Sequence, residues 1–148
     1  MTRTTRSLFG LCSSVVLLVV PGPAVALPFQ LTCPAKYPAL EQVQTLQADG
    51  WRAPFPGIPG APLEQASVSL GPPEENGELK GTPLRSGAGE RFILQGFGDD
   101  LEKWAFCGYR SPTGDVRLMH KIPVNALACE TRVRRERGGL VDASVRCE

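Results

Sequence analysis

Several features common in enzymes and nucleic-acid-binding proteins are missing from this sequence of 148 residues. It has one histidine, His120, and it lacks a glycine-rich phosphate loop and the H-E-x-x-H and G-x-S-x-G motifs. Serine and cysteine nucleophiles usually need a base beside them, so any such mechanism would have to use His120. The formal net charge is +1, and no long run of like charges occurs. A near-neutral chain has no electrostatic reason to seek nucleic acid or anionic membranes.

Long hydrophobic runs are also scarce. The only one covers residues 8–20, after a short segment with two arginines and no acid. It is shorter than the roughly 20 residues that a membrane-spanning helix needs, so we expect no stable membrane anchor. A Pro-Gly-Pro step and then Ala-Val-Ala follow the run. This order predicts a cleaved secretory signal peptide over residues 1–26 and a mature N-terminus at Leu27.

Close cysteine pairs are absent as well. Cys12 lies in the predicted signal peptide, and the other four cysteines are separated by 74, 22 and 18 residues. Zinc sites usually contain closely spaced pairs, so we expect no metal and instead two disulfides formed in an oxidising compartment. Residues 27–148 are enough for one domain with one modest core. The four cysteines are Cys33, Cys107, Cys129 and Cys147.

Alternation of apolar and polar residues dominates the second half of the chain and predicts five strands there, and two further strands are predicted in the first half. The expected fold class is all-β: a small antiparallel meander that forms a twisted sandwich or a partly closed barrel. Residues 38–48 have three apolar residues spaced three apart, which slightly favours a short helix over an extended segment. The predicted strands are residues 29–33, 63–70, 92–95, 103–110, 116–122, 128–135 and 141–147.

In the last hairpin, one register places several residues opposite suitable partners at the same time. A three-residue loop at 137–139 aligns two cysteines, an apolar face and two pairs of opposite charges, whereas a two-residue Gly-Gly turn would oppose Cys129 to Glu148. The three-residue loop is therefore favoured. The aligned pairs are Cys129 with Cys147, Glu130 with Arg146 and Arg134 with Asp142.

This register decides the expected disulfides. Directly opposed residues of antiparallel strands approach closely enough for a disulfide, so we predict Cys129–Cys147. Cys33–Cys107 then remains as the second bridge. The competing pattern, Cys107–Cys129 with Cys33–Cys147, would need the hairpin to slip.

The central hairpin is expected to turn at Pro112 and Gly114, which suit a three-residue loop. That loop opposes Phe106 to His120 and gives the hairpin one largely apolar face. His120 is therefore expected to be structural and to have no hydrolytic role.

Several short motifs with cysteine, proline, tryptophan or glycine are spread along residues 27–148. The motifs are Cys33-Pro34, Gly50-Trp51, Gly71-Pro72-Pro73, W-A-F-C-G-Y at 104–109, Ile122-Pro123, Cys129-Glu130 and Cys147. Together they resemble a family of small uncharacterised exported proteins of Gram-negative bacteria, over nearly the whole mature chain. The family's frame is CP, GW, a Gly-Pro step, W-x-x-C-x-Y, a proline shortly before a cysteine, and a last cysteine. The resemblance implies export and the cysteine frame, and it brings no catalytic residues or cofactor.

Two charged clusters could carry chemistry. Asp99, Asp100 and Glu102 could serve a calcium loop or a glycosidase, but an acidic turn between strands is the commoner meaning of such a run. The second cluster is basic and lies on the last hairpin, where neighbouring acids should largely neutralise it, so we expect a solvated surface. Its arginines are Arg132, Arg134, Arg135 and Arg137, and the acids are Glu130, Glu136 and Asp142.

The Pro-rich segment 53–62 is the strongest functional candidate. Proline cannot join a sheet interior, so an exposed, extended loop is expected, with Phe55 and Ile58 available to a partner or folded back on the core. The leading hypothesis is a non-enzymatic periplasmic or secreted protein, of inhibitor or immunity type, that binds another envelope or exported protein. The second is a small-ligand or envelope-glycan binding protein, and the third a hydrolase that uses the acidic turn.

Overall fold

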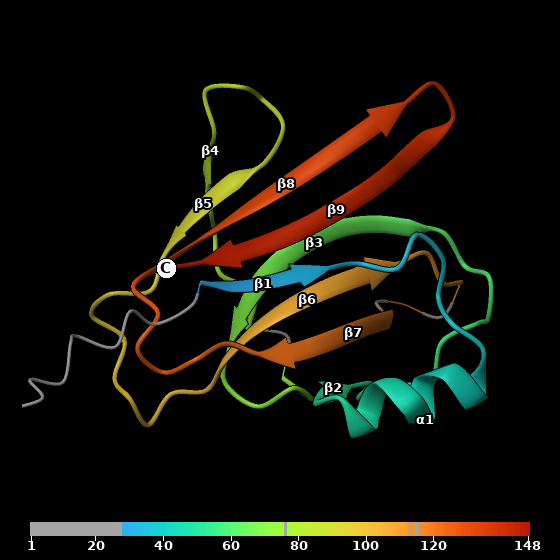
Figure 1. The fold of residues 1–148 in the computed structure, drawn as a ribbon, viewed down its shortest axis with the longest axis horizontal. Coiled ribbons are helices and arrows are strands. Elements are labelled where there is room, and N and C mark those ends of the chain that lie inside the picture. The colour runs from blue at the N-terminus through green and yellow to red at the C-terminus, as the bar shows by residue number, and fades with distance from the viewer. Residues whose placement is uncertain (1–27, 76, 113, 115) are drawn as a thin grey trace, which may run out of the picture.

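The computed structural model describes residues 28–148 except residues 76, 113 and 115, and at residues 140 and 141 it describes the backbone. The predicted signal peptide and Leu27 lie outside this range. The described chain forms two antiparallel sheets, ordered β1-β9-β8-β5-β4 and β2-β7-β6-β3 (Figure 1). The elements are β1 (Phe29–Thr32), α1 (Leu40–Ala48), β2 (Trp51–Arg52), β3 (Leu63–Leu70), β4 (Thr82–Pro83), β5 (Glu90–Ile93), β6 (Lys103–Tyr109), β7 (Val116–Lys121), β8 (Ala128–Glu136) and β9 (Gly139–Cys147).

The main core lies between the two sheets. Phe92 and Val145 of the five-stranded sheet belong to the same buried cluster as Val68 and Leu118 of the four-stranded sheet. This confirms the all-β fold class, and the described strands form two sheets that do not close into a barrel. α1 lies at one side, next to β2 and β7 (Figure 1).

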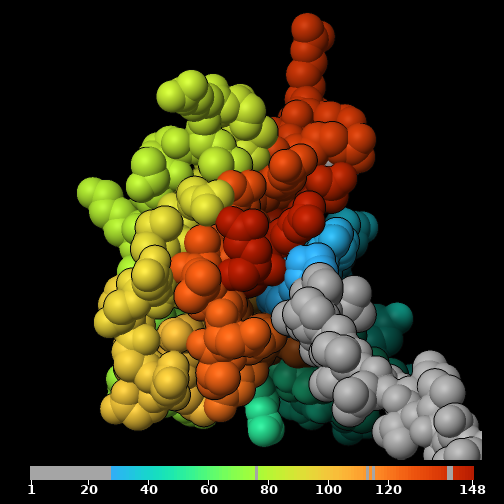
Figure 2. Space-filling model, turned by 60° about the vertical axis from the view of Figure 1, so that its left-hand side comes forward, coloured from blue at the N-terminus to red at the C-terminus, as the bar shows by residue number. Residues whose placement is uncertain are grey.

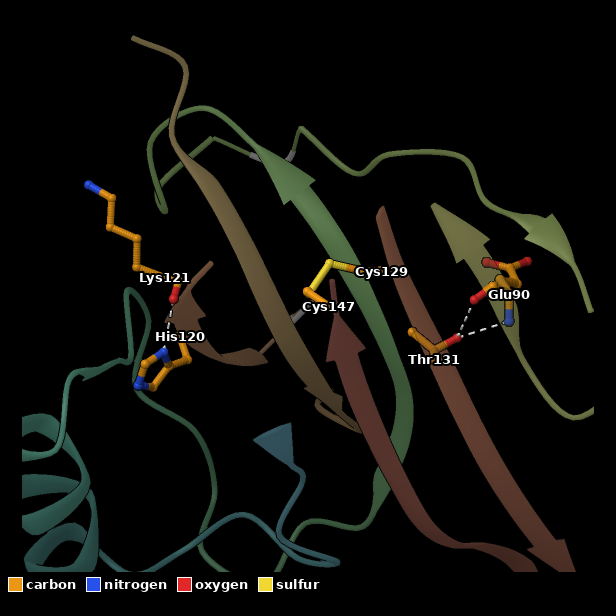
Figure 3. The surroundings of a disulfide bond; sticks show 6 residues. All are labelled: Glu90, His120, Lys121, Cys129, Thr131 and Cys147. Carbon is orange, nitrogen blue, oxygen red and sulfur yellow. Dashed lines mark hydrogen bonds between the residues drawn. A yellow bond between two sulfur atoms is a disulfide. The ribbon is translucent and has the colours of Figure 1, made fainter. Parts of the chain in front are cut away.

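Both predicted disulfides are confirmed. Cys33, directly after β1, is bonded to Cys107 of β6 and so links the two sheets covalently. Cys129 is bonded to Cys147 directly across the β8–β9 ladder (Figure 3).

The register of the last hairpin is confirmed along most of its length, but its loop is shorter than predicted. Glu136 opposes Gly139, so the loop is formed by residues 137–138 rather than 137–139. A register shift between Arg134 and Arg135 absorbs the one-residue difference. The cysteines and charges correctly predicted the pairing between the disulfide and this bulge. Between the bulge and the loop, the paired residues are shifted by one position from the prediction.

The register predicted for the central hairpin is wrong by one residue. Phe106 opposes Met119 rather than His120, and His120 opposes Ala105. A slip of one residue moves a whole strand's side chains to the other face. The predicted turn contains residues 113 and 115, which lie outside the described part of the chain.

The true register creates a second apolar cluster on the outer face of the four-stranded sheet. Trp104, Phe106 and Met119 are at most 5% exposed there. Arg117 covers the Phe106 ring, with its guanidinium carbon 4.1 Å from the ring centroid. The same guanidinium donates to the Glu78 carboxylate at 3.4 Å. This sheet is therefore buried on both faces.

The first half of the chain contains the predicted short helix, α1. The side-chain oxygen of Gln42 accepts the N–H of Ala39 at 3.2 Å at its start, and Gly50 follows its end with φ of 90°. Val43 is buried, whereas Leu40 is 70% exposed. The sequence does not predict β2 and β4, which are two residues long each.

Two motifs that are far apart in the sequence meet beside the first disulfide. The Tyr109 hydroxyl, two residues after Cys107, donates to the carbonyl of Pro34 at 2.9 Å. The Tyr37 ring packs edge-on against Tyr109, with ring centroids 5.3 Å apart. The C-P and C-x-Y motifs therefore form one structural unit that holds the segment after β1 against β6.

We expect Tyr109→Phe to lower the free energy of unfolding by about 1 kcal/mol, because it deletes one hydrogen bond to a partly buried carbonyl. Burial, followed by the influence of Tyr37, raises the pKa of Tyr109 above its ordinary value. The folded state therefore holds this proton more tightly than the unfolded state, where the phenol pKa is about 10. The stabilisation that Tyr109 contributes to the free energy of unfolding is therefore complete below about pH 10 and falls as the pH rises further. Urea unfolding between pH 8 and 11 measures this. The free energy of unfolding should fall less steeply with rising pH in the variant than in the wild type, and an equal fall in both would contradict this role.

Candidate functional site

The Pro-rich loop, residues 53–62, is fixed at its base. The Gly60 N–H donates to the Tyr37 carbonyl, and the Tyr37 N–H donates to the Ala61 carbonyl, both at 2.8 Å. Gly57 packs so closely on the Tyr37 ring that a Cβ at this position would overlap it. The loop backbone is therefore tied to the rest of the fold at several points.

The loop nevertheless presents apolar side chains at the surface. Phe55 is 44% exposed and Ile58 is 52% exposed. Leu40, at the start of α1, is also well exposed. Exposed large apolar side chains gathered in one region are typical of interaction surfaces.

A groove of about 290 Å³ runs between this loop and α1. Tyr37, Val43 and Pro56 make much of its wall apolar, and Gln44 and Gln47 supply amide groups from α1. None of its described lining residues is charged. The loop and helix together thus form an uncharged surface with both hydrogen-bonding and apolar character.

His120 packs inside an aromatic group. Its ring centroid lies 5.4 Å from that of Phe29 and 5.8 Å from that of Trp51. Its Nδ1 lies 3.1 Å from the Lys121 carbonyl oxygen (Figure 3). Its Nε2 lies 3.3 Å from the Asp49 carbonyl oxygen. The ring therefore connects β7 with β1 and with the turn after α1.

The three carboxylates of the acidic turn differ in their surroundings. Asp99 and Asp100 are exposed, whereas Glu102 accepts a hydrogen bond from Lys121 at 2.6 Å. That hydrogen bond lowers the pKa of the Glu102 carboxyl below its ordinary value. Within the described residues, no group of three or more histidine, cysteine or acidic side chains is placed to hold a metal ion.

A second cleft, of about 500 Å³, lies beside the start of the Pro-rich loop, where Ala53 and Pro54 line it. The edge of Trp104 contributes to its wall, together with Arg52, Glu74 and the Glu102–Lys121 ion pair. Sequence reasoning missed this site because its residues come from separate parts of the chain and form no local motif. Its two cations and two acids balance in formal charge.

The basic cluster on the last hairpin is neutralised only in part by the expected acids. Arg134 pairs with Asp142 at 3.2 Å, as predicted. Glu130 instead pairs with Arg91 of β5 at 2.7 Å. The hairpin end projects from the body of the molecule beside the segment that connects β4 and β5 (Figure 2). The predicted solvated surface is therefore more cationic than the sequence pattern implies.

Comparisons of the chain with protein families, with curated proteins and with solved structures found no match. In the part of the chain that the structure describes, no helix combines the length and the apolar composition needed to cross a membrane. Two disulfides are typical of proteins that fold in an oxidising compartment outside the cytoplasm.

Proposed function

We propose that this chain is a non-enzymatic, exported protein of the bacterial cell envelope that binds another protein, in the manner of an inhibitor or immunity protein. The observation that carries the proposal is the Pro-rich loop, whose base is fixed while Phe55 and Ile58 remain exposed. A loop that is already ordered loses little conformational entropy on binding. Apolar side chains held in this way suit insertion into a partner's cleft.

Periplasmic location is part of the same proposal. It is supported by the signal-peptide pattern of residues 1–26 and by the two disulfides. The resemblance of the cysteine and tryptophan motifs to a family of exported Gram-negative proteins points the same way.

The double variant Phe55→Ser, Ile58→Ser should lose at least about tenfold in affinity for the partner, because two apolar anchors are removed. Its free energy of unfolding should change by less than about 1 kcal/mol, since both side chains are largely exposed. Mature oxidised protein would be immobilised and exposed to envelope extract, and the retained protein would then be purified for titration calorimetry.

The matched control is Val124→Ser, Leu127→Ser, which removes two apolar side chains that are 58% and 57% exposed on the connection between β7 and β8. This control should retain the partner fully. Equal loss in both double variants would indicate non-specific adhesion, and a large fall in melting temperature of the loop variant would place Phe55 and Ile58 in the core. Either result would contradict the proposal.

The cleft beside Trp104 favours a second candidate, the binding of an envelope glycan. Its balanced charges supply both donors and acceptors, and Pro54 and Pro73 give it apolar walls. Titration with soluble peptidoglycan fragments, followed by calorimetry on the wild type and on Arg52→Ala, separates the two candidates. The glycan candidate requires saturable binding that the substitution weakens.

A further inference from the structure

The outer edge of β3 is covered at both ends by its own chain. At one end, the Leu63 N–H donates to the Ala35 carbonyl at 3.1 Å. At the other end, the Leu79 N–H donates to the Val68 carbonyl, and the Leu70 N–H donates to the Gly77 carbonyl, both at 2.8 Å. β3 is the edge strand of its sheet, with β6 as its neighbour on the other side. The middle of this edge lies between the two covered ends.

Backbone groups in the middle of β3 lack partners. The bonds of Val68 and Leu70 show that even-numbered residues of this strand direct their N–H and C=O groups away from β6. The N–H and C=O of Ala66 and the N–H of Val68 therefore face the free edge, and among the described residues they have no hydrogen-bond partner. The side chains of Ala66 and Val68 belong to the main core, so the open edge at this point offers backbone groups alone. Unpaired groups along a sheet edge are a template for pairing with another strand, so these groups are available to a partner.

A groove of about 390 Å³ opens beside this edge. Ala66 lies on one wall, and Thr131 and Val133 of β8 lie on the opposite wall. The rest of the lining combines two glycines, Gly87 and Gly89, with Pro83 and the charged residues Glu78, Glu90 and Arg135. In Figure 1, β3 passes below β8 and β9, so the groove lies between the two sheets at their open side.

A hydrogen bond from Arg135 shows that a carbonyl group of the open edge can accept a donor from outside the strand. The Arg135 guanidinium reaches from β8 to the Glu64 carbonyl of β3 at 3.4 Å. A side-chain donor thus already binds the first outward carbonyl of the open edge. The next groups along the strand, those of Ala66 and Val68, have the alternating donor and acceptor spacing that another strand would match.

We propose that this groove binds an extended segment of another protein, which adds to β3 as a short antiparallel strand. The segment would continue the ladder that Gly77 and Leu79 already begin. The open edge from Glu64 to Val68 has room for about three to five residues at roughly 3.3 Å per residue. Because β8 and the segment between β4 and β5 line the same groove as β3, we expect a single extended strand to enter it more readily than the edge of a second folded copy. This site is separate from the Pro-rich loop, and the proposal does not depend on the loop's function.

The free protein offers a first test. The amides of Ala66 and Val68 should exchange with solvent deuterium at least about tenfold faster than those of Ser67 and Ser69, which face β6. Residue-resolved exchange by NMR on the mature oxidised protein measures this alternation. Equal protection of all four amides would show that the edge is already paired, and would overturn the proposal.

A peptide probe gives the second test. Linear heptapeptides would be selected from a random displayed library on the mature protein, and one that shifts the Ala66 and Val68 amide resonances would be chosen. N-methylation at the alternate positions that face β3 should weaken it at least about tenfold, whereas methylation at the intervening positions should change its affinity less than about twofold. Failure to select such a peptide, or tolerance of methylation at every position, would overturn the proposal.

The protein variant for this test is Ala66→Pro, which removes the outward N–H and breaks no bond to β6. It should weaken the peptide at least about tenfold. The control is Gln30→Pro, at an exposed position of the edge strand β1 in the other sheet. The Phe55→Ser, Ile58→Ser variant should bind the peptide normally, which separates this site from the loop. If Ala66→Pro does not fold, the methylation series and the amide shifts decide the result.

Discussion

Replacing Cys33 and Cys107 together with alanine should lower the free energy of unfolding by about 4 kcal/mol. The bridge closes a segment in which its two cysteines are 74 positions apart, and chain-entropy arguments give the larger effect to the longer loop. It also joins the two sheets, so its loss releases the segment after β1 from β6. The melting temperature should fall by roughly 10–20 °C. Calorimetry on the oxidised wild type and the double variant measures both quantities.

The matched comparison is Cys129→Ala with Cys147→Ala, whose bridge spans 18 positions. Its expected cost is about 3 kcal/mol on the same argument. This bridge also crosses one ladder that the rest of the hairpin holds in register. A larger loss from this pair than from Cys33 and Cys107 would contradict the view that linking the two sheets is the more important of the two roles.

Phe106→Ala should be nearly as severe, with a loss of about 3–5 kcal/mol in the free energy of unfolding. Phe106 is fully buried on the outer face of the four-stranded sheet, between Trp104 and Met119 and beneath Arg117. Truncation would leave a cavity under a charged side chain that then loses its aromatic contact. Urea denaturation measures the change.

The control for Phe106 is Phe55→Ala, which truncates the same side chain where it is 44% exposed. It should cost less than about 1 kcal/mol. If Phe106→Ala were equally mild, the outer face of the sheet would be a solvated surface, and the second apolar cluster would have no part in stability.

The contrast between the two hairpins shows what limits prediction from this sequence. In the last hairpin, the pairs Cys129–Cys147 and Arg134–Asp142 agree on one register, and the structure has it. In the central hairpin, residues 103–109 are buried on both faces, so alternation carries no information about which face is which. The register then depended on a predicted turn alone, and the prediction missed by one residue.

The candidate sites divide in the same way. Phe55 and Ile58 could be singled out because prolines keep their segment out of a sheet. The cleft beside Trp104 and the open edge at Ala66 have no local signal, because each forms where distant segments meet. The strands β2 and β4 are likewise too short for any periodic pattern and exist through their partners.

The pairing of β1 with β9 bears on when this chain can finish folding. Phe29 lies opposite Cys147, so the first strand of the described chain is hydrogen-bonded to the last. The five-stranded sheet cannot be completed until synthesis has delivered the C-terminal strand, and such distant pairing slows folding. A chain exported N-terminus first while it is still being synthesised would therefore begin to cross the membrane before its five-stranded sheet can close. If the chain is exported as we propose, this order of strands would help to keep it unfolded during passage, before its cysteines are oxidised.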